Sequence, residues 1–176
     1  MRSIYKIVVC SLLTLSITSC EKDLLEKEQY QKEIYLIGAY NRVWTTEVSY
    51  SNEEVKTYFT VSSSGTLALD RDVNVKMKIN EELVDIYNKK YWTVLNEDKY
   101  YKSLDTDLYS IPSLENTVIK HAEGISAEVP VLIKTASLKI DQSYVIPVEI
   151  ESTTGYPISE SGYKMLILLK LKNDYS

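Results

Sequence analysis

The sequence contains few of the residues on which enzymes and metal sites are most often built. Its 176 residues include two cysteines and a single histidine, His121. One histidine excludes a two-histidine metal site within one chain, and a Ser-His-Asp triad would have to use His121. The stretch from His121 to Gly124 is typical of an exposed turn. We therefore expect no metal, no cofactor and no catalytic residue.

A basic surface and long apolar segments are also missing. The formal net charge is −5, which argues against nucleic-acid binding because such binding depends on basic patches that neutralise phosphates. The apolar run from Ile7 to Ile17 is shorter than the roughly 20 residues that a membrane-spanning helix needs. It fits the apolar part of a secretory signal peptide instead.

The end of this run indicates where the mature protein begins. The tetrapeptide Ile17-Thr18-Ser19-Cys20 resembles the lipobox of bacterial lipoproteins. The resemblance implies that residues 1–19 are a signal peptide and that Cys20 is diacylated, becomes the first residue and holds the chain to a membrane. The alternatives are an ordinary signal peptide that happens to contain Cys10 and Cys20, or an uncleaved anchor.

Lipidation of Cys20 limits the chemistry further. No free thiol would remain, which excludes disulfides, thiolate zinc sites and a cysteine nucleophile. Loss of the two cations in the signal peptide shifts the net charge from −5 to −7. The remaining length suits one domain that buries roughly 70% of its unfolded surface. We expect a tether over residues 20–32 and one compact domain over residues 33–176.

The tether carries mixed charge close to the lipidated cysteine, with Lys22, Asp23 and Glu26. Acidic residues in this place resemble an export signal of gut Bacteroidetes lipoproteins, which implies display on the outer face of the outer membrane. We therefore expect a lipid-anchored outer-membrane protein at the cell surface, with the inner leaflet as the alternative.

Alternating apolar residues predict an all-β domain. The strongest pattern runs from Val73 to Ile79, where every second residue is apolar. Turn signals separate six further predicted strands, at residues 34–37, 55–61, 117–120, 127–134, 144–150 and 165–171. The last strand is apolar at nearly every position, which indicates burial on both faces. We expect a two-layer antiparallel immunoglobulin-like sandwich with one short helix, although the cysteine pair of true immunoglobulin domains is missing.

Two of the predicted strands contain a proline, at Pro130 and Pro147. Proline has no N–H to donate to a strand ladder. We therefore predict that Pro130 lies on an edge strand and that Pro147 lies at an edge or a bulge.

One short helix is predicted between residues 81 and 89. Asn80 is a good N-cap, and acidic and basic residues occupy the first and last turns, where the helix dipole favours them. Leu83, Ile86 and Tyr87 fall on one face. We expect this face to pack on a sheet, so that the helix connects the sheets rather than forming a site.

Residues Asp70 to Glu81 place acidic side chains at the spacing of a calcium-binding loop. The sixth place of such a loop needs glycine and holds Val75 here. The loop would also have to bend where the strand alternation is strongest. We therefore interpret these acidic residues as the flanks of a strand.

The most aromatic stretch, residues 91–109, has no regular period and is the predicted ligand site. Sugar rings stack on aromatic faces and form hydrogen bonds with carboxylates. The candidate ligand-binding residues are Trp92, Tyr100, Tyr101, Asp105 and Asp107. The alternative is that Trp92 and one tyrosine cover the end of the sandwich core. The excess of fifteen tyrosines over one phenylalanine suits either role.

Several short motifs occur in an order that resembles a known family. They are Ile34-Tyr35-Leu36 after the lipid cysteine, Tyr87-Asn88 at the helix end, Thr117-Val118-Ile119 before the Gly124 turn, Leu138 six residues before the strand at 144–150, and Gly155 before a final apolar strand. Together they resemble the domain of unknown function that begins many surface lipoproteins of gut Bacteroidetes, often ahead of a lectin-like or family-18 glycosidase module. The likeness covers residues 33–172, although Leu95-Asn96 stands where the family pattern has Leu-Pro. The sequence ends at Ser176 with no such module, so we expect the domain to stand alone.

The resemblance implies an accessory glycan-binding lipoprotein of a polysaccharide-utilisation system. We predict a non-enzymatic surface module that binds a polysaccharide or oligosaccharide. The alternative is a structural or adhesin-type module that contacts proteins of the cell envelope. The sequence disfavours an enzyme, because a glycosidase needs two carboxylates at a set separation and the scattered acids offer no recognisable pair.

Overall fold

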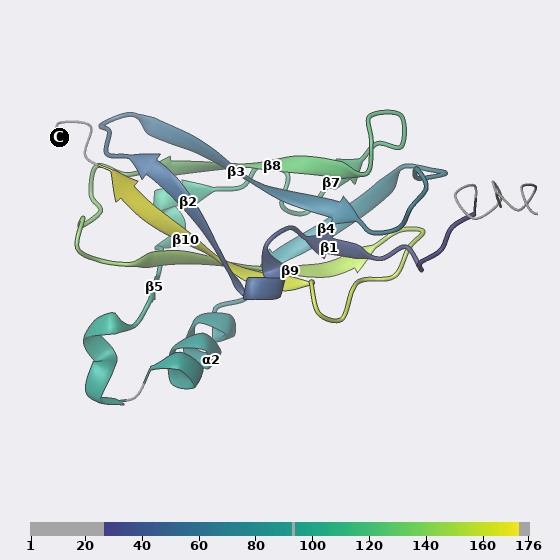
Figure 1. Cartoon of the computed structure of the whole chain (residues 1–176). Helices are drawn as coiled ribbons and strands as arrows, with labels where there is room; N and C mark the ends of the chain where they lie inside the picture. Colours follow the sequence, from purple (N-terminus) through teal and green to yellow (C-terminus); the bar gives the residue numbers. More distant parts are fainter. Residues whose placement is uncertain (1–26, 93, 173–176) are drawn as a thin grey trace, which may run out of the picture.

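The structure is a computed structural model that describes residues 27–92 and 94–172 (Figure 1). The predicted signal peptide, the lipid attachment site Cys20 and the first part of the predicted tether lie outside these residues. None of the described helices is long and apolar enough to cross a membrane.

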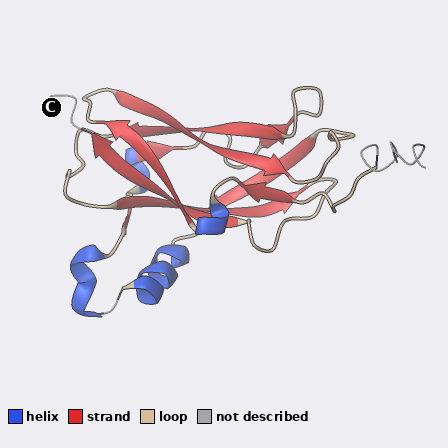
Figure 2. Ribbon diagram, viewed as in Figure 1, coloured by secondary structure: helices blue, strands red, loops and turns tan. Residues whose placement is uncertain are grey.

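Two sheets form the two layers of a sandwich (Figure 2). The first sheet has the order β1 (Ile34–Leu36), β3 (Glu54–Ser63), β8 (Ser126–Lys134) and β6 (Tyr109–Ser110). The second has the order β2 (Val43–Ser49), β10 (Lys164–Lys172), β9 (Tyr144–Thr153), β4 (Val73–Ile79) and β7 (Thr117–Ile119), and β5 (Lys102–Ser103) also pairs with β9. The predicted two-layer all-β sandwich is confirmed. It is not purely antiparallel, because β2 runs parallel to β10 and β5 parallel to β9.

The described residues contain one α-helix, α2 (Glu82–Tyr91), which confirms the predicted helix with a small shift of its ends. The side-chain oxygen of Asn80 accepts a hydrogen bond from the backbone N–H of Glu82 at 3.2 Å. Asn80 therefore satisfies one of the free donors at the helix start, as its residue type predicts. Three short 3-10 helices, η3 (Ala39–Asn41), η4 (Val94–Lys99) and η5 (Thr106–Leu108), complete the described helical structure.

The main core lies between the two sheets and follows the strand alternation. Val73, Val75 and Met77 of β4 are fully buried, whereas the polar residues between them are exposed. Phe59 and Val61 of β3 are buried from the opposite layer. Apolar residues at every second position thus fill the space between the layers and leave a polar outer face.

Strand β10 is buried on both of its faces, as its nearly continuous apolar sequence predicts. Met165 and Ile167 belong to the main core. Leu166 points the other way and belongs to a second apolar cluster with Leu83 and Val84 of α2. Figure 1 shows α2 on the outer side of the sheet that contains β9 and β10. The helix therefore packs on the outer face of the second sheet.

The sequence pattern does not predict β2, and the structure shows why. Val48 is the one residue of its sequence VWTTEVS that is fully buried, so apolar alternation is nearly absent. The strand instead pairs along its whole length with β10. A strand at the edge of a sheet needs only one partner and little burial, and periodicity detects such strands poorly.

Neither Pro130 nor Pro147 lies on an edge strand, so the prediction of edge strands is wrong. The pairing of β9 with β4 does shift register, but between Ile150 and Ser152 rather than at Pro147. β8 lies between β3 and β6, and β9 lies between β10 and β4. β6 reaches no closer to Pro130 than Leu132. On β9, pairing with β5 ends at Val145 and pairing with β4 begins at Val148. Each proline thus lies beside a gap in the neighbouring ladder, where a missing N–H is tolerated.

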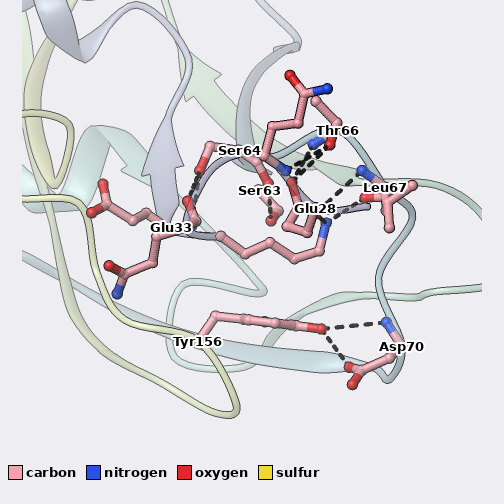
Figure 3. Close-up of polar contacts among 11 residues, drawn as sticks. Glu28, Glu33, Ser63, Ser64, Thr66, Leu67, Asp70 and Tyr156 are labelled. Atoms are coloured by element: carbon pink, nitrogen blue, oxygen red, sulfur yellow. Dashed lines mark hydrogen bonds and ion pairs between the residues drawn. The ribbon is translucent and has the colours of Figure 1, made fainter. Parts of the chain in front are cut away.

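The start of the described chain is bound to the loop after β3 (Figure 3). The Glu28 carboxylate accepts hydrogen bonds from the backbone N–H of Thr66 at 2.7 Å and from that of Leu67 at 3.2 Å. Lys32 pairs with Glu28 at 2.5 Å and donates to the carbonyl of Leu67. We call these four residues the N-terminal clasp. Gly65 fits beside it because φ is 107° there and a Cβ would lie 2.9 Å from Lys32 Nζ.

The clasp changes the acidity of Glu28 and involves part of the predicted tether. The Lys32 side chain, followed by the Thr66 amide, holds the pKa of Glu28 well below its ordinary value of 4.5. A carboxyl group with a lowered pKa stabilises the folded state above its unfolded pKa and loses that contribution as the pH falls toward the folded value. The predicted tether, residues 20–32, thus ends in a segment that contacts the domain and responds to acid.

We expect the amide NMR signals of Thr66 and Leu67 to shift with pH only well below pH 4.5, because Glu28 stays ionised down to that range. In Glu28→Gln, which removes the charge, this shift should vanish and the same amides should move toward their unbound positions. Two-dimensional amide spectra recorded between pH 2 and pH 7 measure both effects. Glu53→Gln, at an exposed acid outside the clasp, is the control. A titration midpoint near 4.5 at both amides would contradict the clasp.

Candidate functional site

A pocket of about 270 Å³ lies where η3, α2 and the start of β10 meet. In Figure 1 η3 is the short dark-blue helix near the upper end of α2. The residues that line the pocket are Ala39, Tyr40, Arg42, Leu83, Ile86, Tyr87, Glu160, Ser161, Tyr163, Lys164, Met165 and Leu166. This pocket is our candidate functional site, and we call it the η3–α2 pocket.

The pocket has an apolar floor and a polar, aromatic mouth. Leu83, Met165 and Leu166 are buried and belong to the two apolar clusters, so the floor is part of the core. Tyr40 at the mouth is 88% exposed, and Ile86 is 52% exposed. An apolar floor with a few polar groups around it is the usual composition of a small-molecule site.

The turn after β1 places Tyr40 at this mouth. Gly38 before η3 has φ of 89°, and Arg42 after it has φ of 63°, so both ends of the short helix are left-handed. A Cβ on Gly38 would lie 2.6 Å from Trp44 Cε3, so glycine is required there. The carbonyl of Arg42 accepts a hydrogen bond from the Leu166 N–H at 2.8 Å and ties the turn to β10.

Tyr87 connects the pocket to a stack of tyrosines. Its ring lies 5.2 Å from the Tyr101 ring at an interplanar angle of 11°, and 4.5 Å from the Tyr91 ring at 34°. Burial, followed by the effect of Tyr101, raises the pKa of Tyr87 to about 12. The Tyr87 hydroxyl therefore stays protonated at neutral pH and can donate a hydrogen bond.

Asn88 holds this stack together from inside the helix. Its amide nitrogen donates to the Tyr101 carbonyl at 2.9 Å, and its side-chain oxygen accepts from the Tyr101 N–H at 3.0 Å. Asn88 is only 5% exposed. Both backbone groups of Tyr101 are satisfied by one buried side chain, so Asn88 joins the irregular segment after the helix to α2.

The predicted ligand residues near the end of α2 are partly buried. Trp92 is half-buried, its indole Nε1 is buried without a hydrogen-bond partner in the described part of the chain, and Lys99 Nζ lies 5.7 Å from its ring. Tyr101 packs on the second apolar cluster, and Tyr100 is half-buried.

The two predicted acidic residues lie elsewhere. Asp105 and Asp107 are exposed around η5, where the backbone carbonyl of Asp107 accepts a hydrogen bond from Lys134 Nζ at 3.2 Å. None of the five predicted ligand residues lines the η3–α2 pocket, although Tyr101 touches it through Tyr87. A ligand role for these five residues therefore stays a prediction.

Sequence reasoning missed Tyr40, Arg42 and Tyr163 as pocket residues. They come from two turns that have no strand or helix pattern, and the turns meet only because β2 and β10 are neighbours. The one sequence feature that pointed to this part of the pocket was Gly38, directly after the first predicted strand, since a glycine there indicates a tight turn. The helix, which sequence reasoning treated as a connector, supplies three of the lining residues.

The acidic residues with calcium-like spacing are engaged in other contacts. Arg71 contacts both carboxylate oxygens of Asp70 at 2.9 Å, and the Tyr156 hydroxyl donates to the same group (Figure 3). His121 lies 2.6 Å from Asp72 through Nδ1 and 3.0 Å through its backbone N–H. No cluster of three or more His, Cys, Asp or Glu within residues 27–92 and 94–172 could hold a metal ion.

The chain matches a known protein family over most of its length. A family model described as a "-like, N-terminal domain" matches residues 30–157 of the chain. No curated protein matches the sequence. The matched range includes η3, α2 and every described strand except β10, and it ends before the turn that carries Tyr163.

Several solved structures share the fold. A protein of unknown function from Bacteroides ovatus has a TM-score of 0.69 and 18% identity, over 84% of this chain and 48% of that chain. An auxiliary nutrient binding protein from Bacteroides thetaiotaomicron has a TM-score of 0.62 and 16% identity, over 79% and 47%. EndoBT-3987 from Bacteroides thetaiotamicron, solved with a Man5GlcNAc product, has a TM-score of 0.56 and 20% identity, over 78% and 30%. The chain thus spans half or less of each of these proteins. At these identities the likeness concerns the fold alone.

We expect Asn88→Ala to lower the free energy of unfolding by about 1–3 kcal/mol, because two partly buried backbone groups of Tyr101 lose their partner. Urea denaturation followed by far-ultraviolet circular dichroism measures this change. The near-ultraviolet signal of the tyrosines should weaken as the stack loosens. Lys89→Ala, at an exposed position one residue away, should change stability by no more than about 0.5 kcal/mol. Equal effects of the two substitutions would show that the hydrogen bonds between Asn88 and Tyr101 do not contribute to the free energy of unfolding.

Proposed function

This chain belongs to the family of N-terminal domains whose model matches residues 30–157, a Bacteroidetes domain of unknown function, and from that premise we propose that it is a non-enzymatic glycan-binding lipoprotein. The observation that carries the proposal is the η3–α2 pocket. Its mouth combines three tyrosines with charged groups over an apolar floor. A sugar has an apolar ring face and a polar rim, and this combination complements both.

The nature of the fold neighbours supports a role in capturing glycans. One neighbour is an auxiliary nutrient binding protein, and another was solved with a Man5GlcNAc product. The ligand site of either protein need not lie in the shared domain, since this chain covers 47% and 30% of their lengths. The argument for this chain therefore rests on its own pocket.

The composition of the pocket favours binding over hydrolysis. Most glycosidases use two carboxyl groups on either side of the scissile bond, roughly 5–10 Å apart. Glu160 is the single acidic residue among the lining residues of the η3–α2 pocket. A sugar bound there would lack the second carboxylate that acts as base or nucleophile, so we propose recognition without turnover.

The glycan proposal is tested by retention on immobilised polysaccharides. We expect the purified protein to bind at least one of a panel of neutral and acidic polysaccharides, and Tyr40→Ala to weaken that binding about 5- to 10-fold through loss of a stacking face. Tyr58→Ala removes an exposed tyrosine of β3 outside the pocket and should leave binding unchanged.

Trp92→Ala separates the two candidate sites. A loss of binding in Trp92→Ala but not in Tyr40→Ala would move the ligand to the stretch at 91–109. No retention of the unmodified protein on any polysaccharide would end the glycan proposal. Capture of a defined envelope protein in that case would favour the structural or adhesin-type alternative.

We also propose that Cys20 carries the lipid that anchors the chain in the outer membrane, with the domain at the cell surface. Intact-mass measurement of the membrane-extracted protein should give the mass of residues 20–176 plus acyl chains. Cys20→Ser should appear unprocessed or leave the membrane fraction. Protease added to whole cells should digest the anchored protein if it faces outward. An unacylated wild-type chain would refute the anchor, and a chain protected from protease would refute the surface location.

A further inference from the structure

The charge of the η3–α2 pocket is opposite in sign to that of the whole chain. The chain has a formal net charge of −5. The pocket is lined by two cations, Arg42 and Lys164, against one acid, Glu160. Lys164 Nζ also lies 4.8 Å from the Tyr163 ring, so this cation sits beside an aromatic face of the same pocket.

These two cations differ from most of the described lysines on the second sheet. Lys76, Lys78 and Lys170 each lie within 4 Å of a carboxylate. Among residues 27–92 and 94–172, neither Arg42 nor Lys164 forms an ion pair with any acid. Their charges are therefore free to meet an anion from solution.

The backbone at Arg42 supplies an independent observation. Arg42 is the one residue other than glycine in the described ranges with positive φ, at 63°. Such a conformation costs a residue with a Cβ of order 1–3 kcal/mol, and such residues cluster at ligand sites. Neither its backbone N–H nor its carbonyl is available to a ligand, because these groups bond to Ala39 and Leu166. The Arg42 side chain, with its guanidinium group, is therefore the part of this residue that can contact a ligand in the pocket.

We propose that the η3–α2 pocket selects sugars that carry a carboxylate, that is, uronic acid residues of an acidic glycan. The planar guanidinium of Arg42 matches a carboxylate through two parallel hydrogen bonds, and Lys164 adds a second positive charge. Tyr40, exposed at the mouth, covers the apolar face of the sugar ring. The Glu160 carboxylate repels the anion and lowers the affinity. This inference rests on the proposed function, since it names the class of glycan for the same pocket.

The test compares each acidic sugar with its own neutral form. The probes are trimers of galacturonate, glucuronate and mannuronate, each paired with its methyl ester, and binding is measured by titration calorimetry on the purified protein. The unmodified protein should bind at least one trimer about 10-fold more tightly than its ester, and the difference should shrink with added salt. Dextran sulfate serves as a polyanion without carboxylates and should bind no better than the esters.

Three substitutions assign the effect to the pocket. Arg42→Gln should lower the affinity for the acidic trimer about 10-fold and leave the ester unchanged. Lys164→Gln should lower it several-fold, and Glu160→Gln should raise it by about 2- to 3-fold. Lys170→Gln removes a cation of β10 that is paired with Glu47 outside the pocket, and should have no effect.

Arg42→Gly separates binding from folding. Glycine tolerates a φ of 63°, so this variant should melt about 2–4 °C higher than the unmodified protein while it loses the preference for the acidic trimer. A gain in melting temperature with unchanged preference would overturn the role of Arg42.

The outcomes distinguish this inference from the proposed function. Equal binding of the acidic trimers and their esters would overturn the selection of carboxylates but leave glycan binding intact. Equal binding of dextran sulfate and the trimers would overturn it as well, because a general attraction of polyanions would explain the result. Binding of no sugar at all would end both proposals.

Discussion

The burial of β10 on both faces is the constraint on which the rest of the structure depends. Met165 and Ile167 fill the space between the sheets, while Leu166 packs beneath α2. Full burial of one such side chain stabilises the fold by about 1.5–3 kcal/mol, a large fraction of a typical net stability of about 5–15 kcal/mol. Ten residues are too few for a helix that is stable in isolation, so α2 depends on this sheet face for its structure. The η3–α2 pocket is the space left where η3, α2 and the start of β10 meet.

The residues of the pocket therefore have two different roles in the molecule. Leu83 and Leu166 on the floor are buried in the second apolar cluster, and their replacement would disturb packing before it disturbed any ligand. Tyr40 is 88% exposed at the mouth and belongs to a turn that is fixed by its two ends. Because the fold does not need the Tyr40 side chain, its ring can serve a ligand at little cost to stability. The chemistry of the mouth can thus vary independently of the sandwich beneath it.

The sequence predicts those strands and helices whose pattern of apolar residues matches the residues that are buried in the structure. Strand β4 and helix α2 have strong periods and β10 is a nearly continuous apolar run, and the structure has all three at nearly the predicted residues. The pattern fails at β2, which is determined by its pairing with β10 rather than by its own apolar residues. It also fails for the order of the strands that contain Pro130 and Pro147, since a gap in one neighbour tolerates a proline as well as a sheet edge does. The pocket could not be predicted for the same reason as β2, because its mouth joins two turns that lie about 120 residues apart and meet only through strand pairing.

The contrast between the acidic chain and its cationic pocket has a consequence for how a ligand would be recognised. At physiological ionic strength the Debye length is about 8 Å, so the net negative charge of the chain is largely screened beyond that distance. An acidic sugar is therefore neither strongly repelled nor steered by the protein as a whole, and it senses Arg42 and Lys164 only within about 8 Å of them. Charges in such a site contribute mainly specificity for an anion, and their effect weakens as salt is added. A long, repetitive polysaccharide suits this arrangement, because many weak contacts of short range can follow one another along a single chain.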